Sequence, residues 1–402
     1  MSTSESARTR SRLPAAIIAL GFTSLFNDIG TEMIFPLLPA FVASLGAAPA
    51  FLGLVEGLAD ATSSLLKLAS GYVAERRSKK RIVVLGYGLA SLVRPLVALA
   101  SAPWHVLVVR VTDRVGKGIR TAPRDALIAD SIPKEQAGRA FGFHSAMDHA
   151  GAVVGPLLAT ALLALGWQVR SVFWFALVPG VLTMLALLTV REPKSASRPA
   201  AASHEPPPTT GAVLPASLRR YFAILALFSL GNSSDAFLLL RAKDLGVSIV
   251  SIPLLWAAFS GAKVLSARYG GIWSDRIARP KLIVAGWAVY AVTYLAFGIA
   301  THAWQVWALF LVYGVYYGLT EPAEKALVRD LAPTEARGRA YGLYNFIVGV
   351  SAVPAGLLTG WLWQAWSPFV ALTSGAVLAL AAAILLLTWT RTGPTTPFVT
   401  QV

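Results

Sequence analysis

Two segments of this chain resemble each other, ALIADSIPKEQAGRAFG at residues 126–142 and ALVRDLAPTEARGRAYG at residues 326–342. Nine of the paired positions are identical. The same shift of 200 residues sets Trp104 on Trp304, and a shift of 205 sets Asn27 on Asn232. Self-similarity over so long a period marks a duplicated structural unit, so we predict two halves with the same topology.

The composition around these repeats identifies the kind of unit. Of 402 residues, 55% are hydrophobic and only 14% are charged, which leaves too little polar surface to cover a soluble core of this size. Long apolar runs recur, and each can cross a hydrocarbon layer of about 30 Å. We predict an all-α polytopic membrane protein with twelve transmembrane helices at residues 14–45, 50–74, 82–100, 104–130, 139–164, 171–190, 221–241, 249–274, 282–300, 303–328, 340–362 and 369–390.

A polar segment divides six spans from six. Its run of Pro, Ser, Lys and Arg cannot bury enough apolar surface to fold. We therefore expect an N-terminal six-helix bundle at residues 1–190, a cytoplasmic linker at 191–220 and a C-terminal six-helix bundle at 221–402. The two bundles should be pseudo-symmetric.

Basic residues set the orientation. With both termini in the cytoplasm, 23 of the 35 Lys and Arg fall in inner segments, three in outer loops and nine within spans. Because positive loops stay inside, we predict a multi-pass protein of a bacterial-type inner (plasma) membrane. The same account explains the net charge of +15 without a nucleic-acid partner.

Two loop motifs resemble a known family. GYVAERRSKKR at residues 71–81 follows the second span, and GIWSDR at 271–276 follows the eighth. Both resemble the Gly-x-x-x-Asp-Arg-x-Gly-Arg-Arg/Lys signature of the major facilitator superfamily, with Glu75 in the first Asp position. GAVVGP at 151–156 is similar to the antiporter motif of that family, and the run at 110–125 is similar to a bacterial permease subgroup of unassigned substrate. The resemblance implies secondary transport by alternating access and no enzymatic activity.

Ionisable groups inside spans are costly and normally serve transport. Asp28 and Glu32 lie one helical turn apart, so they repel, and binding a proton relieves that repulsion. His144 and Asp148 have the same spacing and could form a proton relay. The alternative is that such groups only hold helices together, Glu32 for example by a cap or a pair with Lys67 or Arg94. The proton-coupling candidates are Asp28, Glu32, Asp60, Asp113, His144 and Asp148.

Candidate substrate ligands come from both halves. A cationic stripe on the fourth span suits an anionic group, and aromatic residues of the later spans suit stacking on an organic solute. The alternative for the stripe is pairing with nearby acids or lipid phosphate. The substrate-binding candidates are Asn27, Arg94, Arg110, Arg114, Asn232, Asp235, Lys263, Tyr313, Tyr317, Tyr344 and Asn345.

Gating candidates lie at the cytoplasmic ends of the spans. The 200-residue shift sets Arg124-Asp125 on Glu324-Lys325, so opposite charges could pair across a closed inner mouth. The alternative is pairing within each half. Glu75 with Arg76 and Asp275 with Arg276 are expected to be conformational latches.

The sequence favours a proton-coupled secondary active transporter that exports a small organic compound, as in drug or metabolite efflux. The alternative on the same fold is proton-coupled uptake of an anionic solute, and a lipid-moving protein or membrane receptor is the alternative from another class. We expect no cofactor, and no metal site because the chain lacks Cys and has no third ligand at a spacing that matches His144 and Asp148. The expected partners are a small-molecule substrate, protons and membrane lipid, and we expect a monomer.

Overall fold

The computed structural model describes residues 13–76, 78–132, 136–190, 214–333 and 336–392. These residues form twelve helical rods, so the predicted all-helical fold is confirmed, with every rod ending within five residues of its predicted span. The first six rods are α2 (Ala15–Glu32) continued by η1 (Phe35–Leu37) and α3 (Leu38–Ser44), α4 (Pro49–Arg76), α5 (Lys79–Val93) continued by η2 (Arg94–Leu99), α6 (Pro103–Asp130), α7 (Ala137–Ala164), and α8 (Val169–Phe175) with α9 (Leu177–Leu188). The last six are α10 (Ala216–Gly231) with α11 (Ala236–Asp244), α12 (Ser251–Arg276), α13 (Arg279–Ile299), α14 (Ala303–Leu331), α15 (Arg337–Ala365) and α16 (Pro368–Thr392).

Eight of the twelve rods in the described residues are long and apolar enough to cross a membrane. The other four are α4, α6 and α12, which carry charged side chains within their length, and α14, whose charges all lie at residues 321–330. Polar helices survive in a bilayer only when those side chains face the interior of the bundle. The charges of α4 and α6 do so, as the site below shows.

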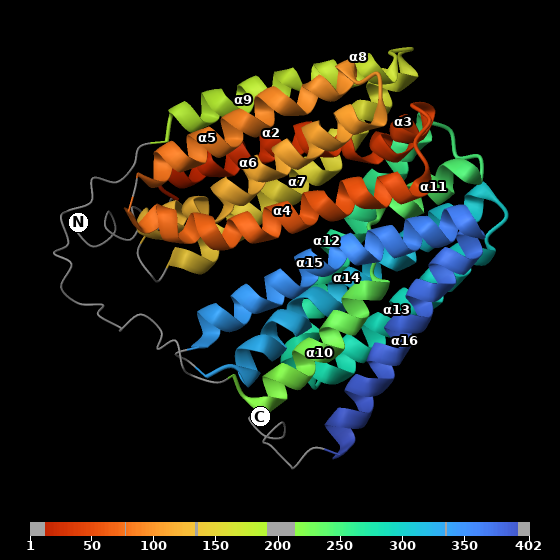
Figure 1. Cartoon of the computed structure of the whole chain (residues 1–402). Coiled ribbons are helices and arrows are strands. Elements are labelled where there is room, and N and C mark those ends of the chain that lie inside the picture. Colours follow the sequence, from red (N-terminus) through yellow and green to blue (C-terminus); the bar gives the residue numbers. More distant parts are fainter. Residues whose placement is uncertain (1–12, 77, 133–135, 191–213, 334–335, 393–402) are drawn as a thin grey trace, which may run out of the picture.

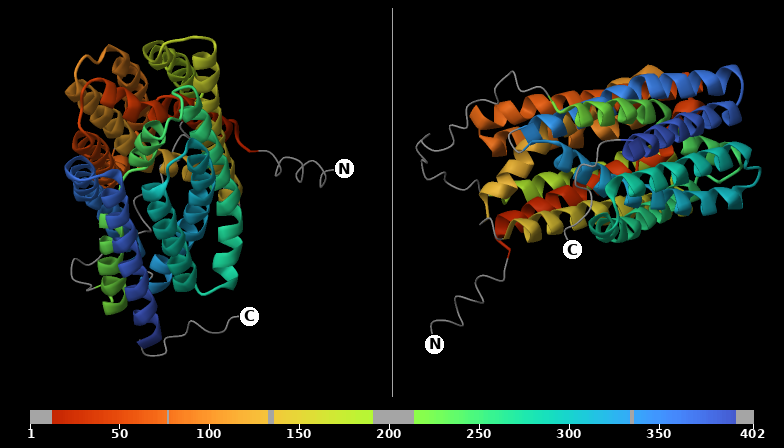
Figure 2. Two further views of the ribbon diagram at one scale, coloured as in Figure 1. Left: turned by 90° about the vertical axis from the view of Figure 1, so that its right-hand side faces the viewer. Right: turned by 90° about the horizontal axis from the view of Figure 1, so that it is seen from below.

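The sequence repeat is also a repeat of packing. In Figure 1, α2 to α9 lie on one side of the molecule and α10 to α16 on the other, and the left view of Figure 2 agrees. Helix α6 packs on α4 and α5, just as α14 packs on α12 and α13. Between the two sets, α4 packs on α15 and α7 packs on α12, and these two contacts are equivalent under the repeat.

Glycines let α4 and α15 touch backbone to backbone. A Cβ added to Gly356 would lie 2.5 Å from the backbone oxygen of Gly53, and one added to Gly360 would lie 2.5 Å from the Cα of Ala50. Any side chain at these positions would push the helices apart. We call Gly53, Gly356 and Gly360 the glycine seam.

The seam lies at one end of the molecule. We call the end where α9 ends and α10 begins the linker end, and the opposite one the far end. In Figure 1, α4 and α15 diverge toward the linker end, whereas the seam holds them together toward the far end. The structure is therefore closed between the two sets of helices at the far end.

One rod differs from its prediction. The span expected at 221–241 is broken, because residues 232–235 lie between α10 and α11 and are not helical. These residues are Asn-Ser-Ser-Asp, whose side chains compete with the helix for backbone hydrogen bonds. Irregular backbone at membrane depth is tolerated where it lines a polar cavity.

Candidate functional site

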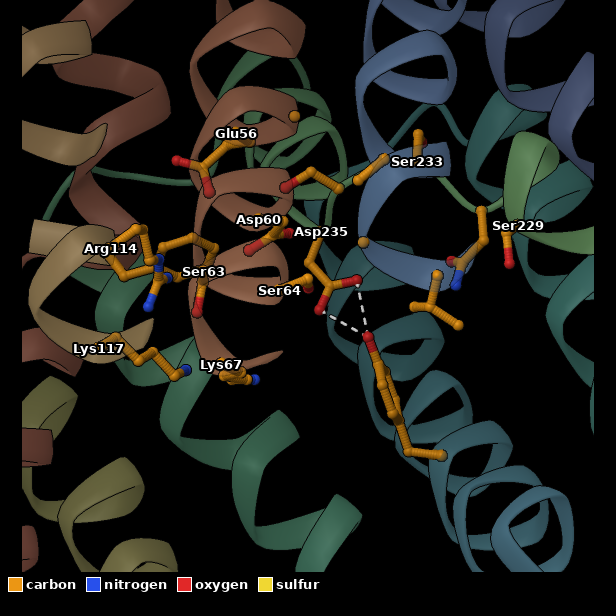
Figure 3. A pocket seen from close by; sticks show the side chains of 18 residues that line it. Glu56, Asp60, Ser63, Ser64, Lys67, Arg114, Lys117, Ser229, Ser233 and Asp235 are labelled. Carbon is orange, nitrogen blue, oxygen red and sulfur yellow. Dashed lines mark hydrogen bonds between the residues drawn. The ribbon is translucent and has the colours of Figure 1, made fainter. Parts of the chain in front are cut away.

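A cavity of about 270 Å³ lies between the two sets of helices, near the middle of the rods that line it. Figure 3 shows it from close by. Rods from both sides contribute, including α4, α6, α14, α15 and the break between α10 and α11. The lining residues are Phe35, Glu56, Gly57, Asp60, Ser63, Ser64, Lys67, Arg114, Lys117, Ser229, Asn232, Ser233, Ser234, Asp235, Tyr317, Val348, Gly349 and Ala352.

Three cations line the α4 and α6 side of this cavity, namely Lys67, Arg114 and Lys117. Among the described residues, none of the three forms an ion pair with a carboxylate. The Nε of Arg114 and the Oγ of Ser63 are buried without a hydrogen-bond partner. Buried polar groups are nearly always satisfied, so this wall has the unmet donors of a binding site.

An acid faces them from the other half. Asp235 directly precedes α11, and its carboxylate accepts hydrogen bonds from the hydroxyls of Tyr313 at 2.7 Å and Tyr317 at 3.0 Å. Figure 3 shows Asp235 approaching the cavity from the side opposite Arg114. The ammonium of Lys263 lies 4.0 Å from the ring centre of Tyr317. These predicted residues are brought together, although Tyr313 and Lys263 stand behind the cavity wall.

Other charged candidates are consumed by buried pairs. Arg94 binds Asp113 at 2.8 Å and donates to the backbone and side-chain oxygens of Asn27 at 3.1 and 3.2 Å. Arg110 donates to both carboxylate oxygens of Glu56, at 2.9 and 2.8 Å. Of these residues only Glu56 lines the cavity. The contacts of Asn27, Arg94, Arg110 and Asp113 therefore fit the alternative in which charges hold helices together.

The acids of the first rod have separate environments. Asp28 accepts a hydrogen bond from the Asn27 amide at 2.8 Å. Glu32 accepts one from the indole Nε1 of Trp256 at 2.8 Å, and Trp256 lies on α12. The pair expected as an alternative between Glu32 and Lys67 or Arg94 is not formed, because Glu32 reaches across to the other half instead.

Helix α7 lies against this region. His144 Nδ1 is 3.5 Å from Asp148, so the predicted pair is brought together. A Cβ added to Gly151 would lie 2.8 Å from the Cβ of Asp28. The antiporter-like motif thus lets α7 approach α2 beside one of the proton-coupling candidates.

The gate residues pair within each half. Arg124 binds its neighbour Asp125 at 2.9 Å, and Lys325 binds Glu321 at 2.8 Å. Glu324 is buried and accepts hydrogen bonds from Trp287 and Tyr344, at 3.0 and 2.8 Å. Neither expected cross-gate pair, Arg124 with Glu324 or Asp125 with Lys325, is formed in this arrangement. The linker end is where α4 and α15 diverge, and there each charge has found a partner on its own side.

The latch candidates are described only in part. Glu75 and Arg76 end α4, but their side chains and that of Asp275 lie outside the described residues, whereas Arg276 is exposed. Two other ion pairs lie at the same loops, Lys79 with Asp130 and Arg279 with Asp330. The two ion pairs occupy positions that are 200 residues apart, so the repeat preserves this contact. The loop motifs alone did not predict it.

The remaining candidates divide between cavity and periphery. Asp60 and Asn232 line the cavity, and the Asn232 amide lies 3.4 Å from the Tyr316 hydroxyl. Tyr344 serves Glu324, and Asn345 is exposed and donates to the carbonyl of Tyr341. The sequence did not point to Ser63, Ser64, Ser233 or Ser234. The Asn-Ser-Ser-Asp run was the available signal, since clustered cap residues inside an apolar span indicate a break.

Comparison with known proteins agrees with this architecture. The model of the Major Facilitator Superfamily matches residues 20–241 and 223–400. An uncharacterized MFS-type transporter of Methanocaldococcus jannaschii is 35% identical over 382 residues, which cover 92% of this chain and 94% of the relative. The multidrug resistance protein MdtG of Enterobacter lignolyticus is 26% identical, over 78% of this chain and 77% of that protein.

Among solved structures, an inward-facing, occupied bacterial homologue of the human lysosomal transporter Spinster superposes with a TM-score of 0.75. It is 18% identical, and the match covers 94% of this chain and 96% of that one, so it supports the fold alone. The helical rods around a central polar cavity define a membrane transporter. The chain belongs to the major facilitator superfamily, whose members are secondary transporters and not enzymes.

Proposed function

We propose that this protein is a proton-coupled transporter that exports a small polar organic solute by alternating access. The observation that carries the proposal is the cavity between the two sets of helices, which holds unpaired Lys67, Arg114 and Lys117 at the middle of the membrane. Charged groups without partners at this depth are expected only where a substrate or a proton completes them. Residues 1–190 and 221–402 would then act as the two moving units, joined by the linker at 191–220.

Proton coupling is assigned to the acids near the interface of the two halves. Glu32 bonds across that interface to Trp256, and Asp28 lies where α7 touches α2. Protonation of Glu32 would turn an acceptor oxygen into a donor and weaken this contact between halves. Coupling requires such a link between the charge of one group and the balance of two arrangements.

The proposed direction of transport, export, rests on similarity to other proteins. The motif at 151–156 resembles that of antiporters, and several distant relatives are multidrug resistance proteins. The cations of the cavity favour the second candidate, proton-coupled uptake of an anionic solute. The cavity of about 270 Å³ is slightly smaller than most ligand sites, which measure about 300–1,000 Å³, and this argues against a bulky drug.

The test uses purified protein in liposomes, with a solute panel and an imposed pH gradient. We expect uphill movement that collapses with the gradient and is lost in Asp28→Asn or Glu32→Gln, while solute exchange persists. Asp244→Asn, at an exposed acid on α11, is the matched control and should transport normally. Normal uphill transport in both Asp28→Asn and Glu32→Gln would eliminate this coupling site. The direction of solute movement across inverted vesicles decides between export and uptake.

A further inference from the structure

We propose that the cavity binds a small dipolar solute, with its anionic group among Arg114, Lys117 and Lys67 and its cationic group at Asp235. This proposal names the substrate class of the transport site proposed above and rests on that assignment of the cavity. It is carried by charged side chains on two opposed walls that form no ion pair among the described residues.

The first wall is built for an anion. Lys67, Arg114 and Lys117 line one side of the cavity and form no ion pair among the described residues. Arg114 is only 9% exposed, yet its Nε has no acceptor, and the same holds for the Oγ of Ser63, which is 4% exposed. Three like charges at membrane depth repel, so an anion that accepts from the guanidinium and the hydroxyl would satisfy all of them.

The opposite wall is built for a cation. Tyr313 and Tyr317 donate to the Asp235 carboxylate, which fixes its orientation. No Lys or Arg in the described part of the chain pairs with Asp235, although Lys263 is close by, over the Tyr317 ring. A carboxylate accepts about four hydrogen bonds, so capacity remains for an ammonium group. Asp60 on α4 adds a second acid to the same cavity.

The two walls belong to different halves of the chain. Arg114 lies on α6, and Asp235 lies at the break before α11. A solute with only one charged group satisfies one wall and leaves the other uncompensated. A dipolar solute of amino-acid size would satisfy both, and it would link the two halves while it is bound.

The experiment measures binding to purified wild-type protein without any gradient. The probes are matched sets made of each standard amino acid, its N-acetyl derivative and its amide, with phosphoethanolamine as a phosphate-bearing zwitterion. We expect at least one zwitterion to bind, and to bind at least about tenfold more tightly than both of its singly charged relatives, because each relative lacks one charge-assisted hydrogen bond.

Variants assign each wall. Asp235→Asn should reduce binding of the zwitterion to the level of its N-acetyl derivative and leave that derivative unaffected, and Arg114→Gln should do the same with respect to the amide. Lys243→Gln and Asp244→Asn, at exposed residues of α11, are the matched controls.

Three results would overturn the proposal: singly charged relatives that bind as tightly as the zwitterion, Asp235→Asn protein with unchanged affinity, or no binding by any member of the panel. The first and third need only wild-type protein, so misfolding of a variant cannot obscure them. Binding without proton-driven movement in liposomes would contradict the proposed coupling and leave the dipolar site standing.

Discussion

Arg110 shows how a single residue is made tolerable inside this membrane protein. Its guanidinium meets both oxygens of Glu56, and both side chains are at most 5% exposed. Behind it, the ring of Phe35 lies 5.0 Å from the guanidinium carbon. The pair joins α6 to α4 and keeps Glu56 from competing for the free cations of the cavity.

Removing one partner of this pair should be costlier than removing both. Glu56→Gln leaves a buried guanidinium without its counter-charge, so we expect the free energy of unfolding to fall by about 3–5 kcal/mol. Glu56→Met with Arg110→Met should recover much of that loss, because no charge is then stranded. Thermal unfolding in detergent measures both, and equal losses in the single and double variants would contradict a compensated pair.

The partners of such residues could not be read from the sequence. That Arg94, Arg110 and Asp113 lie inside a span and must be neutralised followed from burial costs alone. Which acid each one meets depends on the helix faces that packing brings together. Glu56 is therefore absent from the predicted site residues, and Arg110 is predicted to bind substrate although the structure pairs it with Glu56 on α4.

At the scale of elements, two tryptophans each donate a hydrogen bond to a glutamate, one within a set of helices and the other between the two sets. Trp287 on α13 donates to Glu324 on α14, within one set of helices. Trp256 on α12 donates to Glu32 on α2, in the other set. The first bond holds in any arrangement of the two sets, whereas the second exists only when α12 lies against the first rod.

Trp256→Phe should therefore shift the balance of arrangements. It keeps an aromatic ring against Phe35 and Phe259 but removes the donor to Glu32. We expect labelling of Ala50→Cys, at the closed far end, to speed up by as much as about tenfold, since a hydrogen bond to a charged group contributes about 1.5–3 kcal/mol.

Trp287→Phe is the matched control, because it removes the same donor from a bond that does not join the two sets. The chain has no native Cys, so the introduced thiol reports alone. Equal effects of the two variants, or none for Trp256→Phe, would show that the bond does not hold the halves together.

Elements were more predictable than their interruptions. Long apolar runs and basic loops placed every rod to within five residues. The break at 232–235 was missed because its flanks are strongly apolar, and apolar periodicity outweighs four polar residues in any window of helical length. Short-range capping competition decides there, as the Ser234 hydroxyl illustrates by accepting a hydrogen bond from the backbone N–H of Ala236 at 3.3 Å.

At the scale of the whole molecule, the halves share packing but differ in chemistry. The Arg94 and Asp113 positions of the first half correspond, 200 residues on, to Tyr294 and Tyr313. The ion pair is thus replaced by two rings whose centres lie 5.9 Å apart. The repeat in the sequence predicted the common architecture. The use of an ion pair in one half and of aromatic rings at the same positions of the other half becomes clear only from the folded structure.

The glycine seam should determine how firmly the far end stays shut. Gly356→Ala places a Cβ 2.5 Å from the backbone oxygen of Gly53, which α4 and α15 can accept only by separating. We expect faster labelling of Ala50→Cys, by several-fold, and slower transport. Gly142→Ala is the control, because nothing lies within 4 Å of a Cβ added there. Unchanged labelling in Gly356→Ala would show that the seam does not control closure.

The same seam bears on how fast the protein can turn over. In most helix pairs the side chains of one helix pack between those of the other. Sliding such helices past each other requires these side chains to be separated first. Where Gly53 meets Gly356, no side chains lie between the helices, and the two backbones are in direct contact. Such a contact holds the two helices together, yet it gives little resistance when one helix rotates or shifts against the other. The kinetic barrier to rocking then comes from polar contacts between the halves away from the seam, such as the hydrogen bond of Trp256 to Glu32, which protonation can weaken.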